Sequence, residues 1–409
     1  MLSKFFSTDV ITVFSCMFLT IVTTSDAKVP LPQGNWMPTI KSRLENLIQE
    51  NKNKSKIVIF DFDNTMVSRD IGEATFATLA IENTIHKNSP YAQWAPDFTI
   101  DTRHVSLATS PNVTAYYEDF LEATKHIKDE KTPYSNAYAW IVQIMAGLTP
   151  QDVIAATKKA YKEGTGAKDR EDSSLGETMV NGYRLPFFYP EMIDLAGTMI
   201  SNGFNVYVIT ASNVWSVRYL VTKELNQLLQ KKYGKNTTIA PDHVLGVSTL
   251  LKDKRDGKLY KDESLVKENK AYRNLEISEL QQYELLYELS YPLPAYEGKV
   301  AMIFKHITHE HPFFIAGDSP NDHQMLEWAE NRLWIARLEK KDYQAATAEL
   351  IKNSDKEKWL IQPTLYKKSP GVVASEKELE TRLKLNTAEK ENFTQTIQVF
   401  KNEKALEQF

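Results

Sequence analysis

Short apolar runs that alternate with segments of helical periodicity indicate an α/β fold. Such runs, free of charged residues, occupy residues 57–60, 206–209, 244–247, 313–316 and 333–336. An unbroken apolar run of this length is typical of a strand buried on both faces of a parallel sheet. We therefore predict a Rossmann-like, doubly wound parallel sheet whose ligands bind at the carboxyl ends of the strands.

One long helical segment interrupts this alternation. Residues 70–189 show helical patterns and no comparable β run, so we predict an inserted α-helical cap there. The α/β core would then consist of residues 28–69 and 190–345. A charged turn at residues 252–261 predicts a surface hairpin. The charged residues 346–409 are expected to form a C-terminal helical extension.

The first 27 residues have the pattern of a secretory signal peptide. Lys4 precedes a largely apolar stretch at residues 10–24, and small residues near Ala27 suit cleavage. A retained anchor is the alternative, but the stretch is short for a transmembrane helix. The single Cys16 lies inside it, so the mature chain would have no disulfide. We expect an exported protein, periplasmic or secreted, with no membrane contact after cleavage.

Composition narrows the function classes. The chain is 42% hydrophobic and 25% charged, which is ordinary for a globular protein and excludes disorder. The 49 Lys and Arg residues are dispersed and the formal net charge is −4, so no nucleic-acid partner is expected. The oligomeric state is left open.

Polar residues that suit metal and phosphate chemistry follow three of the predicted strands. They are Asp61, Asp63, Asn64, Thr210, Asp318 and Asp322. Desolvated carboxylates are costly unless a cation or a reaction requires them. Lys299, one predicted helix before the fourth strand, could add a positive charge at the same edge. Such a set suits an oxygen-ligated Mg²⁺ facing a phosphate group.

Two of these choices have alternatives in the sequence. Ser212 could replace Thr210 as the phosphate-binding hydroxyl, but Thr210 ends the apolar run. Lys305 could replace Lys299.

In this order and context, the residues resemble the haloacid dehalogenase superfamily of phosphohydrolases. The resemblance covers about residues 56–65 and 201–338, and the helical insertion stands where that family carries its first-type cap. It implies that Asp61 is the nucleophile, forming an aspartyl-phosphate. It implies that Asp63 is the general acid and then the base that activates water.

The resemblance also implies the ligands of phosphate and metal. Thr210, Lys299 and Asn64 would bind the phosphate. Mg²⁺ would be held by Asp61, Asp63, Asp318 and Asp322.

The entrance of the insertion suggests a substrate. Asp70 and Glu73 could contact a cationic leaving group, although acids in the first turn of a helix are also favoured by its dipole. Some of the insertion's many aromatic residues could enclose a quaternary ammonium. The patterns Gly34-Asn35-Trp36-Met37-Pro38 and Asp70-Ile71-Gly72-Glu73-Ala74 resemble those of exported phosphorylcholine-phosphatase-type members.

The sequence therefore predicts an exported, Mg²⁺-dependent phosphomonoesterase acting on a small phosphorylated molecule such as phosphorylcholine. A phosphoserine-type or broad-specificity acid phosphatase is one alternative. A phosphotransferase is another. A non-catalytic exported protein that binds a phosphorylated ligand is an alternative of a different class.

Overall fold

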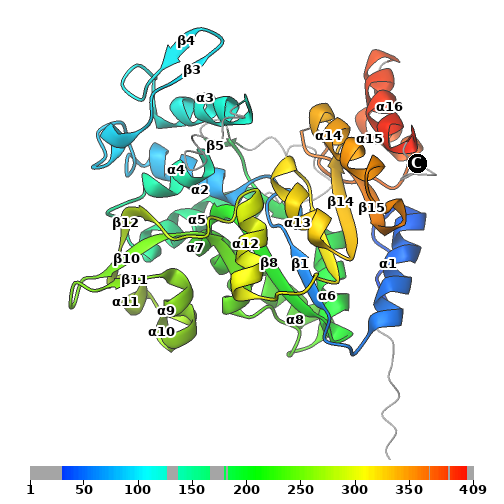
Figure 1. Cartoon of the computed structure of the whole chain (residues 1–409), viewed down its shortest axis with the longest axis horizontal. Helices are drawn as coiled ribbons and strands as arrows, with labels where there is room; N and C mark the ends of the chain where they lie inside the picture. The colour runs from blue at the N-terminus through cyan, green and yellow to red at the C-terminus, as the bar shows by residue number, and fades with distance from the viewer. Residues whose placement is uncertain are drawn as a thin grey trace, which may run out of the picture.

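A seven-stranded sheet lies at the centre of the computed structural model, which describes residues 30–126, 137–165, 179–180, 183–367, 369–385 and 387–402 (Figure 1). The predicted signal peptide lies outside these residues. The strand order is β16–β15–β14–β13–β1–β8–β9. Their bounds are β1 Ile57–Phe60, β8 Asn205–Asn213, β9 Val244–Val247, β13 Phe314–Gly317, β14 Asn331–Arg337, β15 Trp359–Leu365 and β16 Gly371–Val372.

All pairs in this sheet are parallel except β15 with β16. From β1 the chain adds β8 and β9 on one side, then crosses back and adds β13, β14 and β15 on the other. The strand order therefore reverses between β1 and β13, and in open α/β sheets ligands bind at such a switch point. The predicted doubly wound α/β core is confirmed.

Helices connect the parallel strands, because a parallel pair needs a crossover. They are α6 Pro190–Ser201, α7 Val214–Tyr219, α8 Asn226–Tyr233, α12 Glu297–His306, α13 His323–Trp328 and α14 Lys341–Lys352. Three further helices, α1 Pro38–Asn51, α15 Glu376–Leu383 and α16 Thr387–Asn402, lie beside β15 and α14 (Figure 1). Asn213 is the N-cap of α7. Its side chain accepts a hydrogen bond from the Ser216 amide, a common arrangement at helix N-termini.

The insertion is mainly helical, as predicted. Its helices are α2 Ile71–Ile81, α3 Val113–His126, α4 Ala137–Gln143 and α5 Pro150–Thr165, with short hairpins β3 Phe98–Ile100 with β4 Arg103–Val105, and β5 Met179–Val180 with β6 Tyr183–Arg184. The two connections to the core, β2 Val67–Ser68 and β7 Phe187–Phe188, pair antiparallel. The insertion therefore leaves and re-enters the core at one place.

A second, three-stranded sheet in the order β11–β10–β12 lies below the insertion (Figure 1). The predicted charged hairpin is present, with β10 Thr249–Asp253 antiparallel to β11 Leu259–Tyr260. Strand β12 Tyr283–Leu289 was not predicted. Short helices α9 Asp262–Glu268, α10 Lys270–Arg273 and α11 Ile277–Leu280 pack at this end.

The expectation of a purely helical segment at residues 346–409 is wrong for β15 and β16. Strand β15 contains Gln362 and Pro363, which break the apolar run that marks the other strands. The Gln362 side chain is buried because it accepts from the Met37 amide and donates to the Val373 carbonyl, at 3.0 Å each. Pro363 sits near the sheet edge, where a missing amide hydrogen is tolerated.

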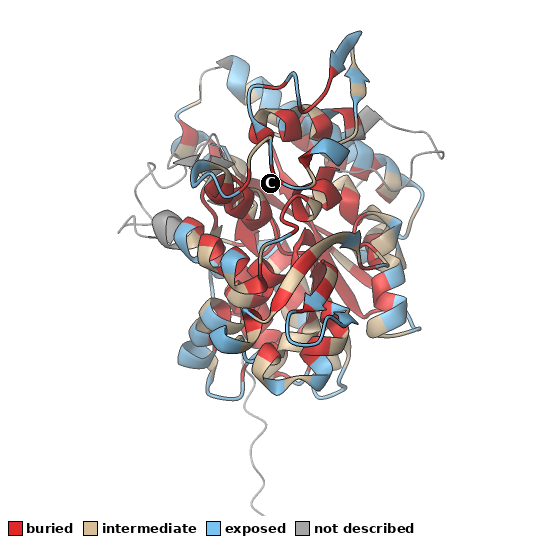
Figure 2. Cartoon of the chain, turned by 90° about the vertical axis from the view of Figure 1, so that its left-hand side faces the viewer, coloured by how far each residue is buried: buried red, intermediate tan, exposed pale blue. Residues whose placement is uncertain are grey.

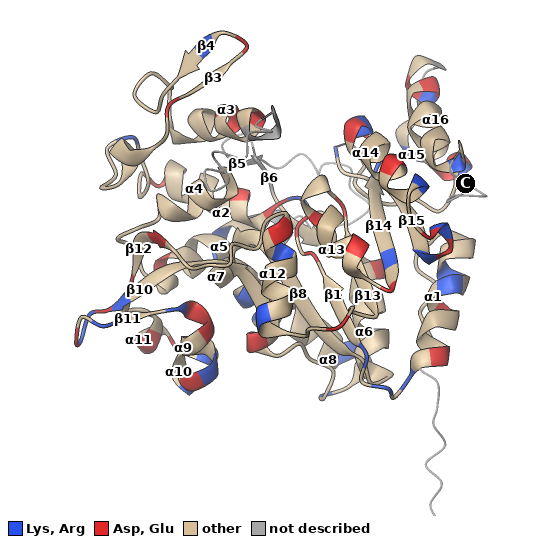
Figure 3. Cartoon of the chain, in the orientation of Figure 1, with Lys and Arg blue, Asp and Glu red and all other residues tan. Residues whose placement is uncertain are grey.

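Buried residues fill the sheet and the helix faces that cover it, and exposed residues lie outside (Figure 2). Lys and Arg are scattered over the described chain, without one basic face (Figure 3). Within the described part of the chain, no helix combines the length and the apolar character needed to cross a membrane.

Candidate active site

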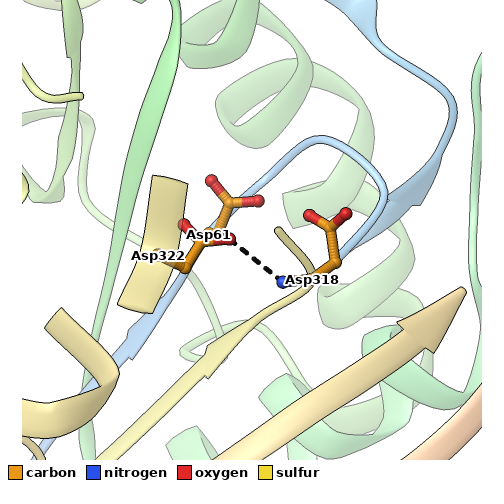
Figure 4. A group of neighbouring side chains, drawn as sticks. All are labelled: Asp61, Asp318 and Asp322. Carbon is orange, nitrogen blue, oxygen red and sulfur yellow. Dashed lines mark hydrogen bonds between the residues drawn. The ribbon is translucent and has the colours of Figure 1, made fainter. Parts of the chain in front are cut away.

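Three aspartates meet at the switch point because two neighbouring strands end there. Phe60 of β1 is in register with Ala316 of β13, and the Asp61 amide donates to the Ala316 carbonyl at 2.9 Å. Asp61 and Asp318 therefore leave adjacent strands together. With Asp322, each offers a carboxylate oxygen that lies within 4.8 Å of the others (Figure 4).

The turn after β13 holds Asp322 in place. Its Oδ2 accepts from the amides of Asp318 and Ser319 at 3.0 and 3.1 Å (the first bond is dashed in Figure 4). Gly317 allows this close approach, since a Cβ there would lie 2.6 Å from the Asp322 Cβ. The short Gly-Asp-Ser sequence thus builds a tight carboxylate-binding turn.

Lys299 links the two sides of the cluster. From α12 its Nζ contacts Asp61 Oδ1 at 2.7 Å and Asp322 Oδ1 at 2.5 Å, and its side chain is almost fully buried. Burial, followed by the charge of Asp322, raises the pKa of Asp61 to about 7, while Lys299 opposes that rise. Lys299 thus favours an ionised Asp61, as does the hydrogen bond from Thr65.

Asp318 is held from two directions. Thr65 Oγ1 lies 3.3 Å from its Oδ1 and also donates to Asp61 at 3.0 Å. Arg337, at the end of β14, forms a buried ion pair with its Oδ2. Burial raises the pKa of Asp318 well above its usual value, and the Arg337 charge acts against this.

The cluster of Asp61, Asp318 and Asp322 has the chemistry of a divalent-cation site. Its donors are hard carboxylate oxygens, and Lys299 and Arg337 supply two positive charges against its three carboxyls. A divalent cation would be held by these three residues.

The structure does not bring the Asp63 carboxylate into this cluster. Its Oδ1 accepts from the Ile71 amide at 2.7 Å, and its Oδ2 from Thr210 Oγ1 at 3.1 Å. Burial, followed by the charges of Asp70 and Asp61, raises the pKa of Asp63 well above the usual value. The Asp63 carboxyl therefore lies outside the group formed by Asp61, Asp318 and Asp322, and the prediction that Asp63 contributes to a metal site stays a prediction.

Thr210, within β8, donates its hydroxyl to Asp63. Ser212 Oγ instead donates to Asp70 at 3.2 Å, and the Ser212 amide donates to Thr210 Oγ1 at 3.0 Å. Both hydroxyls line the cavity. Of the two candidate lysines, Lys299 contacts Asp61 and Asp322. Lys305 is exposed and donates to the Tyr291 carbonyl.

Asn64 has a structural role that the sequence did not predict. Its backbone φ is +57°, and its Oδ1 accepts from the Arg69 amide at 3.1 Å, as its own amide donates to the Arg69 carbonyl. Asparagine tolerates this left-handed conformation better than most residues. Asn64 lines the cavity, but its side chain closes the turn between β1 and the insertion.

Asp70 and Glu73 occupy the first turn of α2. Asp70 is the N-cap and accepts from the Glu73 amide at 2.9 Å, so the capping role is real. Both also line the cavity. Tyr117 donates to Glu73 at 3.1 Å, yet burial and the neighbouring Asp70 and Glu118 raise the pKa of Glu73 to about 8.

These residues surround a cavity of about 450 Å³. Three acidic residues of its lining, here called the acidic wall, are Asp70, Glu73 and Glu118. The basic residues and two tyrosines of its lining, here called the basic wall, are Arg69, Arg337, Lys340, Tyr343, Tyr366 and Lys367. Of the insertion's described aromatic residues, Tyr138 reaches the cavity lining, whereas Tyr116 and Trp140 pack against each other.

The sequence reasoning missed the basic wall. Arg337 follows the apolar run 333–336, so the rule that selected Asp61 at a strand end could have found it. Tyr366 and Lys367 follow β15, which was not recognised as a strand.

Comparison with known proteins places the chain near one named phosphatase. No family model matches it. It is 26% identical over 318 residues to a phosphorylcholine phosphatase of Pseudomonas aeruginosa, covering 75% of this chain and 82% of that one. A protein of unknown function from Anaerococcus prevotii has a TM-score of 0.50 at 17% identity, covering 85% and 98%. A HAD family hydrolase of Salmonella enterica has a TM-score of 0.33 at 12% identity, covering 74% of each chain. The chain is thus similar in sequence to a phosphorylcholine phosphatase and in fold to the Anaerococcus protein.

Proposed function

We propose that this protein is a phosphomonoesterase that acts through an aspartyl-phosphate on Asp61. The observation that carries the proposal is that the carboxyls of Asp61 and Asp63 have different electrostatic surroundings. Lys299 favours an ionised Asp61, whereas burial and nearby acids favour a protonated Asp63. Two adjacent carboxyls whose surroundings assign them opposite protonation states are typical of a nucleophile and a general acid.

The chemistry follows from these positions. The Asp61 carboxylate attacks phosphorus as Asp63 gives its proton to the departing alcohol oxygen, so an aspartyl-phosphate and a free alcohol form. Asp63 then takes a proton from water, which attacks phosphorus and releases inorganic phosphate and Asp61. We propose that Thr210 and Lys299 bind phosphoryl oxygens, because they contact Asp63 and Asp61 respectively.

We propose Mg²⁺ as the cofactor. Asp61, Asp318 and Asp322 would hold it, and when bound it would supply positive charge to the phosphoryl oxygens. Carboxylate oxygens are the donors that Mg²⁺ prefers, which supports this choice over a softer metal.

For the substrate we propose a small phosphomonoester with a cationic leaving group, and phosphorylcholine as the first candidate. The named relative and the acidic wall support it. Each carboxyl of that wall favours a positive charge in the cavity when it is ionised, and Tyr138 adds an aromatic ring to the lining. On the pattern of residues 1–27, we also propose that the protein is exported.

A substrate panel tests the activity. Purified protein is expected to release phosphate from phosphorylcholine faster than from glycerol 2-phosphate, and removal of divalent metal by EDTA should lower the rate about 100-fold or more. Phosphate release is measured colorimetrically, with Mg²⁺ added back as the control. Tight binding of phosphorylcholine without phosphate release would instead favour a binding protein.

The pH dependence of substrate preference tests the acidic wall. The raised pKa of Glu73, about 8, leaves it protonated at neutral pH in the free protein, and its ionised form attracts a cation. The ratio of kcat/KM for phosphorylcholine to that for glycerol 2-phosphate should therefore rise, up to about tenfold, as pH increases toward about 8. In Glu73→Gln the ratio should be flat across this range. An equal rise in Glu73→Gln would remove Glu73 from substrate binding.

A further inference from the structure

The carboxyl of Asp63 is held by two groups that belong to different parts of the fold. Its Oδ1 accepts from the Ile71 amide at 2.7 Å, and its Oδ2 accepts from Thr210 Oγ1 at 3.1 Å. Ile71 begins α2 of the insertion, whereas Thr210 lies in β8 of the central sheet (Figure 1). The orientation of Asp63 therefore depends on how the first turn of α2 is placed against β8.

Two side chains, of Asp70 and Ser212, link these elements to each other. Ser212 Oγ donates to Asp70 Oδ1 at 3.2 Å, and the Ser212 amide donates to Thr210 Oγ1 at 3.0 Å. Asp70 is the N-cap of α2 and is joined to Ile71 by a peptide bond. Together with the two bonds to the carboxyl of Asp63, these contacts close a loop of hydrogen bonds, here called the Asp63 ring, through Asp63, Thr210, Ser212, Asp70 and Ile71.

The glycine at position 72 allows the ring to close. A Cβ at Gly72 would lie 2.4 Å from Ser212 Oγ and 2.9 Å from Ser212 Cβ, which is too close for either atom to stay in place. Only glycine permits such an approach of a helix backbone to a neighbouring side chain. The sequence Asp70-Ile71-Gly72 thus supplies a helix cap, an amide donor and a close contact, and the ring needs all three.

The ring also decides which oxygen of Asp63 can carry a proton. A backbone amide only donates, so Oδ1 is held as an acceptor by Ile71 and the proton is left to Oδ2. Asp63 and Thr210 both line the cavity. A general acid acts only when its proton lies within hydrogen-bonding reach of the atom that receives it. Groups that fix the position of Oδ2 therefore govern the transfer of a proton to the leaving group.

We propose that Asp70 and Ser212 are positioning residues, which orient the general acid Asp63 by closing the Asp63 ring. This inference rests on the proposed function, in which Asp63 protonates the departing alcohol oxygen. It gives Asp70 a role that depends on a hydrogen-bonding oxygen at this position, separate from the charge that Asp70 presents to the cavity.

Two phosphate esters with uncharged leaving groups test the positioning role. Glycerol 2-phosphate releases an alkoxide that needs a proton from the acid, whereas 4-nitrophenyl phosphate releases a stable phenolate that does not. In Ser212→Ala and Asp70→Ala, the ratio of kcat/KM for the alkyl ester to that for the aryl ester is expected to fall about tenfold, because the acid is displaced. In Asp70→Asn this ratio should stay within about twofold of wild type, since the amide oxygen can still cap α2 and accept from Ser212.

Ser216→Ala is the matched control for the serine. Ser216 of α7 is also buried and also links the insertion to the core, since its Oγ lies 3.3 Å from Thr75 Oγ1 of α2 and 2.7 Å from Thr157 Oγ1 of α5. It is not among the residues that line the cavity. Its replacement should leave the ratio within about twofold of wild type, because the Asp63 ring stays intact.

An equal loss on both esters in Ser212→Ala would overturn the proposal, since this hydroxyl would then serve the transferred phosphoryl group. The proposal would also fall if Asp70→Asn lowered the ratio as much as Asp70→Ala, because the charge of Asp70 would then be the property that matters. Wild-type protein that hydrolyses neither ester nor phosphorylcholine would reject the proposed function and this inference together. Wild-type turnover with an unchanged ratio in Ser212→Ala and Asp70→Ala would reject this inference alone.

Discussion

Replacement of Asp61 by asparagine is expected to lower phosphate release by about 10⁴-fold or more, because an amide cannot form the aspartyl-phosphate. The substitution keeps the size of the side chain and removes one charge from a crowded cluster, so the protein should remain folded. Phosphate release from the purified variant is the measurement.

Asp194→Asn provides the matched control for this substitution. Asp194 is a buried carboxylate of α6 that bonds to Lys232 and Tyr233 and does not line the cavity. Its replacement should leave the specific activity within about twofold of wild type, since it lies outside the catalytic groups. Turnover at the wild-type rate by Asp61→Asn protein would refute the nucleophile assignment.

The second large effect is expected from Lys299→Ala. Loss of this buried ammonium leaves Asp61 and Asp322 without their shared cation, and breaking a buried ion pair on one side typically costs about 3–5 kcal/mol of stability. Activity should fall about 10²–10³-fold as well, because the nucleophile and the phosphoryl oxygens lose a fixed positive charge. Urea unfolding of metal-free protein and phosphate release measure the two effects.

Lys305→Ala is the control, because Lys305 lies on the same helix but is exposed. Its replacement should change the unfolding free energy by less than about 0.5 kcal/mol. If Lys305→Ala lost activity and Lys299→Ala did not, the alternative lysine of the sequence reasoning would hold the phosphate.

The basic wall could not be predicted from the sequence, because part of it follows a strand that was not recognised. The other parallel strands can be recognised in the sequence as apolar runs, but the apolar run of β15 is interrupted by Gln362 and Pro363. Burial of Gln362 is possible because Met37 and Val373, distant in sequence, complete its hydrogen bonds. Without that knowledge, Tyr366 and Lys367 could not be placed at the cavity.

The direction of individual side chains was also beyond the sequence. Asp63 follows Asp61 by two residues, and the motif alone suggested that both face a metal. The Ile71 amide and the Thr210 hydroxyl instead hold Asp63 apart from the carboxylate cluster. Local spacing does not report such contacts, because their donors come from α2 and β8.

By itself, the sequence determined that strand ends would carry Asp61, Thr210 and Asp318 to one edge of a parallel sheet. It could do so because the strands that carry these residues, unlike β15, are uninterrupted apolar runs, and parallel strands end on the same side of the sheet. Only the tertiary structure decided which carboxyls contact Lys299, which carboxyl pKa values burial raises, and which charged residues line the cavity. Those outcomes depend on desolvation and on contacts between elements that lie far apart in the sequence. Neither can be inferred from a local stretch of the chain.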